Sequence, residues 1–125
     1  MQPIPFMTNC IFCDIIAKTA PAEIFYEDED LIVINNIQPL APIHWLIIPR
    51  RHIVSLNELT KEDEALAGRL LLAVSKMAVK AGIADKGYRT AINTGSQGGQ
   101  TVFHLHIHLL GGQHVDKSLL SSGFK

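Results

Sequence analysis

The chain lacks several features that would each assign it to a broad class of protein. It has no excess of charge, because 11 basic and 12 acidic residues leave a formal net charge of -1. Binding to nucleic acid or to an anionic membrane would therefore need a local basic patch, and the sequence offers only Arg50–Arg51. No apolar run approaches the roughly 18 residues that a membrane-spanning helix requires. We expect neither a membrane nor a nucleic-acid partner.

The start of the chain lacks the marks of a signal peptide, since residues 1–7 have neither a basic start nor an apolar core. Internal repeats, low-complexity tracts and linkers are also missing. Among 125 residues, a hydrophobic fraction of 47% is sufficient for the core of one domain. We expect a cytoplasmic protein with a flexible extension over residues 1–9, one domain over residues 10–112 and a tail over residues 113–125.

Cysteine is scarce, and the only two, Cys10 and Cys13, lie close together. A disulfide between residues three apart would close a very small loop and would stabilise the chain little. In a reducing cytoplasm the pair is better explained as two metal ligands or as a redox motif. A structural zinc site needs four ligands, so the pair alone does not define one.

The hydrophobic pattern predicts an α+β fold with two layers. One long helix is expected to begin near a capping Thr60 and to end near Gly82, with a continuous apolar stripe facing a sheet. Met77 and Trp45 are interpreted as core residues. A short helix is expected near residues 10–17, and five strands of a mainly antiparallel sheet are expected at residues 22–27, 31–34, 43–50, 88–93 and 101–110.

Three histidines, His104, His106 and His108, occupy alternate positions in the last expected strand. Alternation places them on one face and the aliphatic residues between them on the other. Burying three unpaired imidazoles would be costly, so we expect them to have a function. Two of them could bind one metal ion, or one could act as a nucleophile while its neighbours contact the substrate. The middle position favours His106 as the nucleophile.

A glycine-rich segment precedes the histidines and suits a phosphate. The backbone N–H groups of Gly95, Gly98 and Gly99 can bind phosphate oxygens, and Gln100 and Thr101 add side-chain donors. The sequence has neither a P-loop lysine nor an aspartate-rich magnesium site. A histidine would therefore perform the displacement itself in phosphoryl or nucleotidyl chemistry.

Several motifs resemble those of a known family. His104-Leu-His-Ile-His108-Leu-Leu is similar to the His-φ-His-φ-His-φ-φ signature of the histidine triad (HIT) proteins, where φ is apolar. Further matches are similar to HINT, the nucleoside phosphoramidase branch of that family: Asn93-x-Gly-x-x-Gly-Gly-Gln-Thr-Val-Phe-His104, Ala41-Pro-x-His44 and Leu46-Ile-Ile-Pro-Arg-Arg-His52. The resemblance extends from about residue 10 to residue 112.

The resemblance implies an activity and a role for each catalytic residue. His106 would attack the α-phosphorus of a purine nucleoside phosphoramidate such as adenosine 5′-phosphoramidate, or of a related nucleotide conjugate such as an aminoacyl-adenylate. Water would then hydrolyse the nucleotidyl-histidine to the nucleoside monophosphate. His108 would contact the phosphate, His44 and His104 would orient and support the centre, and Thr101 would bond near the leaving group. Catalysis would require no cofactor.

The same resemblance implies the nucleotide-binding residues and the oligomeric state. Asn93, Gly99 and Gln100 would complete the phosphate site, and Ile37 would line the pocket for the base and ribose. Asn36 stands where the family usually has an aspartate that binds the ribose hydroxyls, and an amide lacks the charge that strengthens such bonds. HINT-like proteins are homodimers in which two five-stranded sheets join.

The relatives that carry the cysteine pair resemble zinc proteins, and they imply that His52 and His104 complete a structural zinc site with Cys10 and Cys13. The alternative is that the cysteines are two small buried residues without a metal. Three other activities also remain as alternatives: a dinucleoside polyphosphate hydrolase of the same family, a metal-dependent hydrolase with the triad as ligands, and a non-catalytic nucleotide-binding module. The metal-dependent hydrolase is disfavoured because no aspartate or glutamate lies near the triad.

Overall fold

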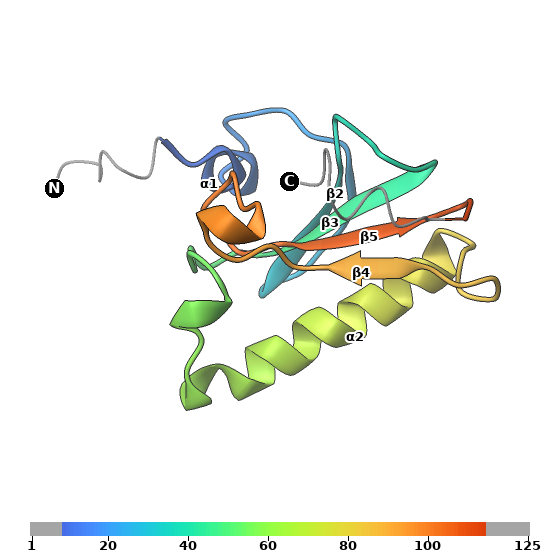
Figure 1. Ribbon diagram of the computed structural model, residues 1–125. Coiled ribbons are helices and arrows are strands. Elements are labelled where there is room, and N and C mark those ends of the chain that lie inside the picture. The colour runs from blue at the N-terminus through green and yellow to red at the C-terminus, as the bar shows by residue number, and fades with distance from the viewer. Residues whose placement is uncertain (1–8, 115–125) are drawn as a thin grey trace, which may run out of the picture.

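Figure 1 shows the computed structural model of the chain, which describes residues 9–114. The helices and strands in chain order are α1 (Ile11–Ile16), β1 (Ile24–Glu27), β2 (Leu31–Asn35), β3 (Ile43–Pro49), α2 (Glu64–Lys80), β4 (Arg89–Ala91) and β5 (Ile107–Gly111). None of the described helices is long and apolar enough to cross a membrane. The extension and the tail expected at the two ends lie almost entirely outside the described residues.

The strands form one antiparallel sheet in the order β1-β2-β3-β5-β4. The long helix α2 covers one face, and the short helix α1 lies on the opposite face near one end (Figure 1). The central strand β3 is paired on both edges and covered on both faces, which explains why its sequence is almost continuously apolar. The five-stranded α+β fold expected from the sequence is confirmed.

Alternate residues of the central strands divide between the two faces. Val33 and Ile47 pack with the α2 side, whereas Ile32 and Ile48 pack with the α1 side. The cluster on the α1 side also contains both cysteines and Leu46. The sheet therefore carries two separate apolar layers, and the smaller one, beneath α1, adjoins the histidines.

Helix α2 follows its sequence signals closely. A 3-10 turn at Lys61–Asp63 precedes it, and an Asp63 carboxylate oxygen accepts a hydrogen bond from the Thr60 backbone N–H at 2.9 Å. Gly82, with φ of 77°, adopts the left-handed conformation that terminates the helix. Met77 and Trp45 are buried as expected, and Trp45 stacks on Phe25.

The expectation that all three histidines lie within one strand is wrong. Strand β5 begins only at Ile107, so the segment of residues 101–106 is irregular and carries His104 and His106. The reason is that β3 ends at Pro49, and the Leu105 backbone N–H instead bonds the Ile53 carbonyl at 2.6 Å. Strand β4 is likewise shorter than expected.

The side chains of this segment nevertheless alternate between the two faces of the sheet. Leu105, Ile107 and Leu109 belong to the apolar cluster under α2. The rings of His104 and His106 contact Phe12 of α1 on the other side of the sheet. An extended chain alternates its side chains whether or not it is hydrogen-bonded into a ladder, so the pattern predicts faces more reliably than strand ends.

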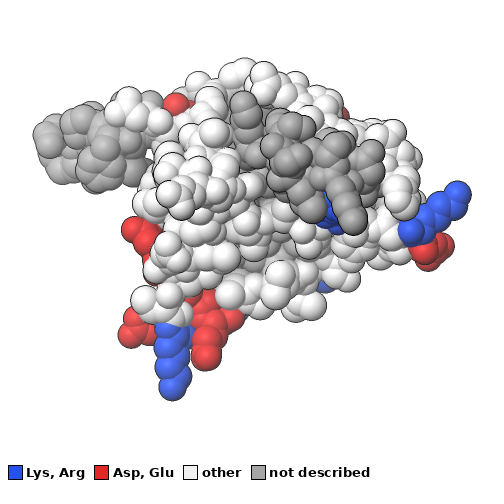
Figure 2. All heavy atoms as spheres, in the orientation of Figure 1, with Lys and Arg blue, Asp and Glu red and all other residues white. Residues whose placement is uncertain are grey.

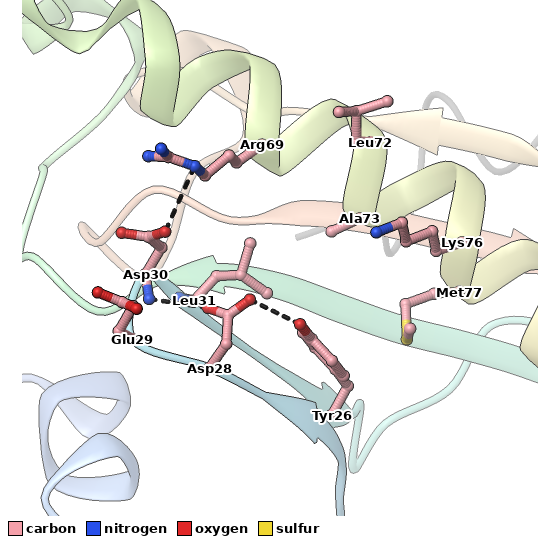
Figure 3. Close-up of a pocket in the computed structure, with 10 residues that line it drawn as sticks. All are labelled: Tyr26, Asp28, Glu29, Asp30, Leu31, Arg69, Leu72, Ala73, Lys76 and Met77. Atoms are coloured by element: carbon pink, nitrogen blue, oxygen red, sulfur yellow. Dashed lines mark hydrogen bonds and ion pairs between the residues drawn. The ribbon is translucent and has the colours of Figure 1, made fainter.

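A hollow of about 300 Å³ lies between α2 and the turn that joins β1 to β2 (Figure 3). Arg69 of α2 pairs with Asp30 at 3.5 Å, and the Tyr26 hydroxyl donates to Asp28 at 2.7 Å. The Arg69 pair joins the hairpin to the helix, whereas the Tyr26 bond lies within the hairpin. None of the ten residues that line the hollow is a histidine, so it is separate from the cluster described next.

Candidate active site and metal centre

Four imidazoles converge on the α1 side of the sheet. His44 comes from β3, His108 from β5, and His104 and His106 from the segment before β5. All four are buried, with exposed fractions between 0% and 4%. The pairing of β3 with β5 brings His44 beside His108, so that His44 Nε2 lies 2.9 Å from His108 Nδ1. The expected fourth histidine thus joins the triad.

The backbone carbonyl of His104 determines which nitrogen of the His106 ring carries the proton. Its Nδ1 lies 2.7 Å from the carbonyl oxygen of His104. A carbonyl oxygen can only accept, so Nδ1 carries the proton and donates it. In the neutral ring, Nε2 is then the nitrogen with the lone pair, which is the form that a nucleophile or base requires.

The His44 and His108 rings are ordered by a second chain of hydrogen bonds. The Leu40 backbone N–H donates to His44 Nδ1 at 3.1 Å, so the proton of the neutral His44 ring is on Nε2. His44 Nε2 lies 2.9 Å from His108 Nδ1 and 3.1 Å from the Asn36 amide nitrogen. Because that amide nitrogen is itself a donor, the Nε2–H donates to His108 Nδ1, and the neutral His108 ring then carries its proton on Nε2. Burial, with a smaller contribution from nearby His106, lowers the pKa of His44 to about 4, which keeps this ring neutral at pH 7.

A cavity of about 520 Å³ opens beside His106 and His44. Its walls are mostly apolar and come from α1, the following loop, β2, β3 and residues 101–102. Amide side chains of Asn35, Asn36 and Gln38 form a polar region within it. Among the described residues, those that line the cavity include no lysine, arginine, aspartate or glutamate. A pocket of this size and polarity suits a small organic molecule.

The structure brings part of the expected nucleotide-binding set to this cavity. Asn36, Ile37, Thr101 and His106 line it, and the Ile37 side chain is 91% exposed at its rim. The Asn36 amide nitrogen lies 3.1 Å from His44 Nε2, and its amide oxygen accepts from the Gln38 backbone N–H at 2.9 Å. Asn36 therefore lies against the histidine cluster as well as the cavity.

Asn93, Gly99 and Gln100 do not line the cavity but support the turn next to it. The Gln100 side chain accepts from the Gly95 backbone N–H at 2.9 Å and donates to the Val54 carbonyl at 2.7 Å. Asn93 donates to the Gly98 carbonyl at 2.8 Å. The segment contains a 3-10 turn at Ser96–Gly98, which the left-handed Gly99, with φ of 84°, ends. Direct phosphate contacts by these residues stay a prediction.

The four expected metal ligands lie close together in the structure. Ligand atoms of Cys10, Cys13, His52 and His104 all lie within 4.8 Å of one another. His104 Nε2 donates to the Pro49 carbonyl at 2.8 Å, so its Nδ1 carries the lone pair.

That nitrogen faces the Cys10 and Cys13 sulfurs at 3.3 Å and 3.6 Å, and His52 Nδ1 lies 3.1 Å from the Cys13 sulfur. Two sulfurs and two imidazole nitrogens at these separations fit an ion with bonds of about 2.0–2.3 Å, as zinc forms. Burial raises the pKa of the Cys13 thiol to about 12, so a metal ion would have to displace its proton.

Sequence reasoning missed the cavity walls. Phe12 and Ile15 of α1 and Leu46 of β3 line the cavity, and the Phe12 ring meets the His106 ring edge-on with centroids 5.0 Å apart. A signal was present, because Ile11, Phe12, Ile15 and Ile16 make the helix apolar around most of its circumference. A six-residue helix with one buried face needs fewer apolar residues than this, and Ile11 remains 47% exposed.

Comparisons with known proteins identify relatives of the chain. The HIT domain matches residues 17–115 of the chain. Protein HitA of Neisseria gonorrhoeae is 48% identical over 105 residues, which cover 84% of this chain and 97% of HitA. A HIT family hydrolase from Legionella pneumophila has a similar structure, with a TM-score of 0.85 and 39% identity over 87% of this chain and 97% of that one.

A zinc-bound histidine triad family protein from Mycobacterium smegmatis is also similar. Its TM-score is 0.73 and its identity 34%, and the match covers 88% of this chain and 79% of that one. The domain match, the identity to HitA and the converging histidines lead to one assignment: the chain belongs to the histidine triad (HIT) family.

Proposed function

We propose that the protein is a hydrolase that acts at the α-phosphorus of purine nucleoside phosphoramidates through a nucleotidyl-His106 intermediate. The observation that carries the proposal is the hydrogen bond from His106 Nδ1 to the His104 carbonyl. It leaves the lone pair on Nε2 of a buried ring that borders the cavity. The similarity to a HIT family hydrolase from Legionella pneumophila supports the same class of reaction.

The proposed reaction has two displacements at the same phosphorus atom. In the first, a bond forms from His106 Nε2 to phosphorus while the phosphorus–nitrogen bond of the substrate breaks, and the leaving amine takes a proton from water. In the second, water attacks phosphorus and gives a proton to the hydroxide left by the first step, the electron pair of the bond to His106 returns to Nε2, and the nucleoside monophosphate is released. The covalent intermediate divides one difficult hydrolysis into two steps.

The neighbouring groups have complementary roles in this proposal. The His108 Nε2–H would donate to a phosphate oxygen, because its Nδ1 already accepts from His44. Thr101 would place its hydroxyl near the leaving group, and the apolar walls around Phe12 would hold the purine. A neutral His44 maintains this arrangement at pH 7.

Mass spectrometry of the full chain with adenosine 5′-phosphoramidate tests the proposal. We expect an adenylyl adduct and steady release of adenosine monophosphate from the wild-type protein, and neither from His106→Ala. His114→Ala is the matched control, since His114 is an exposed histidine outside the site, and it should retain both signals. Binding of adenosine monophosphate without turnover would instead indicate a non-catalytic nucleotide-binding module.

Two further outcomes would assign a different activity to the protein. Cleavage of diadenosine polyphosphates but not of phosphoramidates would indicate the polyphosphate hydrolase of the same family. Turnover that needs a metal ion at the triad, without an adduct on His106, would indicate a metal-dependent hydrolase. The cavity provides no carboxylate for that chemistry among the residues described.

We also propose that Cys10, Cys13, His52 and His104 hold a structural zinc ion. The convergence of the four ligand atoms supports this, as does the zinc-bound relative from Mycobacterium smegmatis. The ion would join α1 to the segments that follow β3 and precede β5, and it would have no part in bond breaking. A reducing compartment such as the cytoplasm would keep both thiols available to the metal.

We propose that the chain forms a homodimer through the side of the sheet that lies opposite the histidines. Strand β4 lies at the sheet edge, and Leu71, Leu72 and Val79 of α2 are each more than 60% exposed. Figure 2 shows charged side chains mainly at the two ends of this view, with uncharged atoms over most of the surface between them. An apolar helix face beside an open strand edge suits pairing with a second copy of the chain.

A further inference from the structure

His104 belongs to both the proposed metal centre and the proposed active site. Its ring Nδ1 faces the Cys10 and Cys13 sulfurs, and its ring Nε2 is held by the Pro49 carbonyl. Its own carbonyl oxygen accepts the proton of His106 Nδ1 at 2.7 Å. Any rotation of the His104 peptide would therefore alter the bond that fixes the His106 ring.

The backbone that carries these two histidines has little support from the sheet. Ladder pairing with β3 starts only at Ile107, and the preceding segment is attached by the bond from Leu105 to Ile53. Together with the buried Leu105 side chain, the His104 side chain attaches the segment further through its bond to the Pro49 carbonyl. If its Nδ1 is also bound to an ion, the ring is held from both sides and the peptide is fixed.

Phe12 provides a second connection between the two sites. It lies between the two cysteines on α1, and its ring meets the His104 and His106 rings edge-on, with centroids 5.8 Å and 5.0 Å apart. It is buried and also borders the cavity. Because α1 has only six residues, its placement depends on its contacts with the rest of the chain, to which both cysteines contribute, rather than on its own stability.

We infer that metal binding by Cys10, Cys13, His52 and His104 orients the nucleophile, with His104 and Phe12 as the positioning residues that act through the His106 ring. The inference rests on the proposed function for its effect on turnover, but the effect on the ring can be observed separately. With the metal, His106 holds one tautomer and one orientation. Without it, the carbonyl of His104 and the ring of Phe12 lose their fixed places, and the His106 ring samples several arrangements.

Imidazole nitrogen NMR of the full chain provides the direct test. With Zn²⁺ bound, we expect one His106 tautomer with a slowly exchanging Nδ1 proton, assigned by its loss in His106→Asn. After chelation, we expect that proton signal to disappear and the two nitrogen shifts to average. Amide signals of the buried α2 residue Ala78 report whether the fold persists. Identical His106 signals with and without Zn²⁺, or a chain that binds no Zn²⁺, would overturn the inference.

Turnover of adenosine 5′-phosphoramidate provides a second measurement. We expect chelation to lower kcat by about tenfold or more, because misplacing a reacting atom by a fraction of an ångström has effects of this size. KM should change less than kcat, since the cavity walls of β2 and β3 remain although those of α1 become less ordered. Absence of turnover in the Zn²⁺-loaded wild type would refute the proposed function alone, and the NMR result would still decide the inference.

Phe12→Leu tests the positioning role if chelation unfolds the chain. Leucine keeps the site apolar but removes the ring that contacts both histidines. With Zn²⁺ still bound, we expect the slow His106 proton to exchange faster and kcat to fall severalfold, and we expect Phe12→Tyr to restore both. Phe103→Leu, at an exposed phenylalanine of the same segment, is the matched control. A Phe12→Leu protein with unchanged exchange and kcat would contradict the inference.

Discussion

His106 and His108 are the same residue type two positions apart, yet the structure gives their rings opposite hydrogen-bonding roles. The His104 carbonyl requires a proton on His106 Nδ1, whereas His44 requires a lone pair on His108 Nδ1. The outer nitrogens are consequently an acceptor on one ring and a donor on the other. A phosphorus centre with a negatively charged oxygen needs both groups, which is the arrangement that the proposed chemistry uses.

Asn36 offers a test at the level of one side chain. We expect Asn36→Asp to lower KM for adenosine 5′-phosphoramidate about fivefold, because a charged acceptor strengthens a hydrogen bond to a ribose hydroxyl by about 1 kcal/mol. A 2′,3′-dideoxy substrate should not gain. Steady-state kinetics with both substrates measures the difference, and an equal gain for the two would exclude a contact with the ribose.

At this scale the sequence pattern and the hydrogen bonding of His106 support the same proposal for the nucleophile. Its middle position in the triad favours His106, and the structure lets the ring donate to a carbonyl, as a nucleophilic imidazole requires. The identity of that acceptor was not foreseeable, because backbone carbonyls have no sequence signature. For Gln100 the sequence predicts a contact with phosphate. In the structure its side-chain amide bonds to the backbone of Gly95 and Val54, and the sequence alone could not distinguish between these two uses of the amide.

Strand β5 shows how far an element can be predicted. The alternating sequence determined correctly which residues face α2, but it did not determine where the ladder starts, because that depends on the partner strand ending at Pro49. Helix α2 was predictable at both ends because its cap and its terminating Gly82 are local signals. The cavity was not predictable, since its walls come from elements that meet only after folding.

The end of β5 allows a stability test. A Cβ placed on Gly111 would lie 2.7 Å from Cδ1 of Ile83, so we expect Gly111→Ala to destabilise the protein by about 1–3 kcal/mol. Ile83→Val removes that methyl group, and the double variant should recover part of the loss. Chemical denaturation of the four proteins in the cycle measures the coupling. Strictly additive effects would show that this contact does not limit the strand.

The molecule as a whole should lose stability as the pH falls. His44 has a pKa of about 4 in the folded chain against about 6.5 when unfolded, so the unfolded state binds a proton that the folded state does not. Its contribution is complete above about pH 6.5 and is lost progressively between that value and about pH 4. Between pH 6.5 and 5.5 we expect a loss on the order of 1 kcal/mol from this group.

Denaturation midpoints at pH 7.5, 6.5 and 5.5 measure this loss. His44→Gln replaces the ring with a group that does not titrate, and its midpoint should depend less on pH over the same range. The metal content should be kept equal, so that the comparison isolates His44. An identical pH dependence in the variant would assign the effect to other groups.

Assembly is the second property of the whole molecule that can be tested. We expect Leu71→Glu to convert the proposed dimer to a monomer in sedimentation experiments, because the charge would be buried against a second copy. Leu56→Glu, at a leucine that is 41% exposed outside α2, should leave the dimer intact. A wild-type chain that sediments as a monomer at micromolar concentration would refute the dimer.

The absence of charged side chains from the described lining of the cavity has a consequence for how a substrate arrives. A nucleotide carries negative charge, but the described lining offers imidazoles and amides rather than a lysine or arginine to attract it at long range. The lining then contributes no electrostatic steering, and with a formal net charge of only -1 on the chain we expect the second-order rate constant to vary little with ionic strength. Such an enzyme would have a similar rate in dilute and in concentrated salt. When substrate is scarce, it would bind substrate more slowly than an enzyme whose cationic groups attract it.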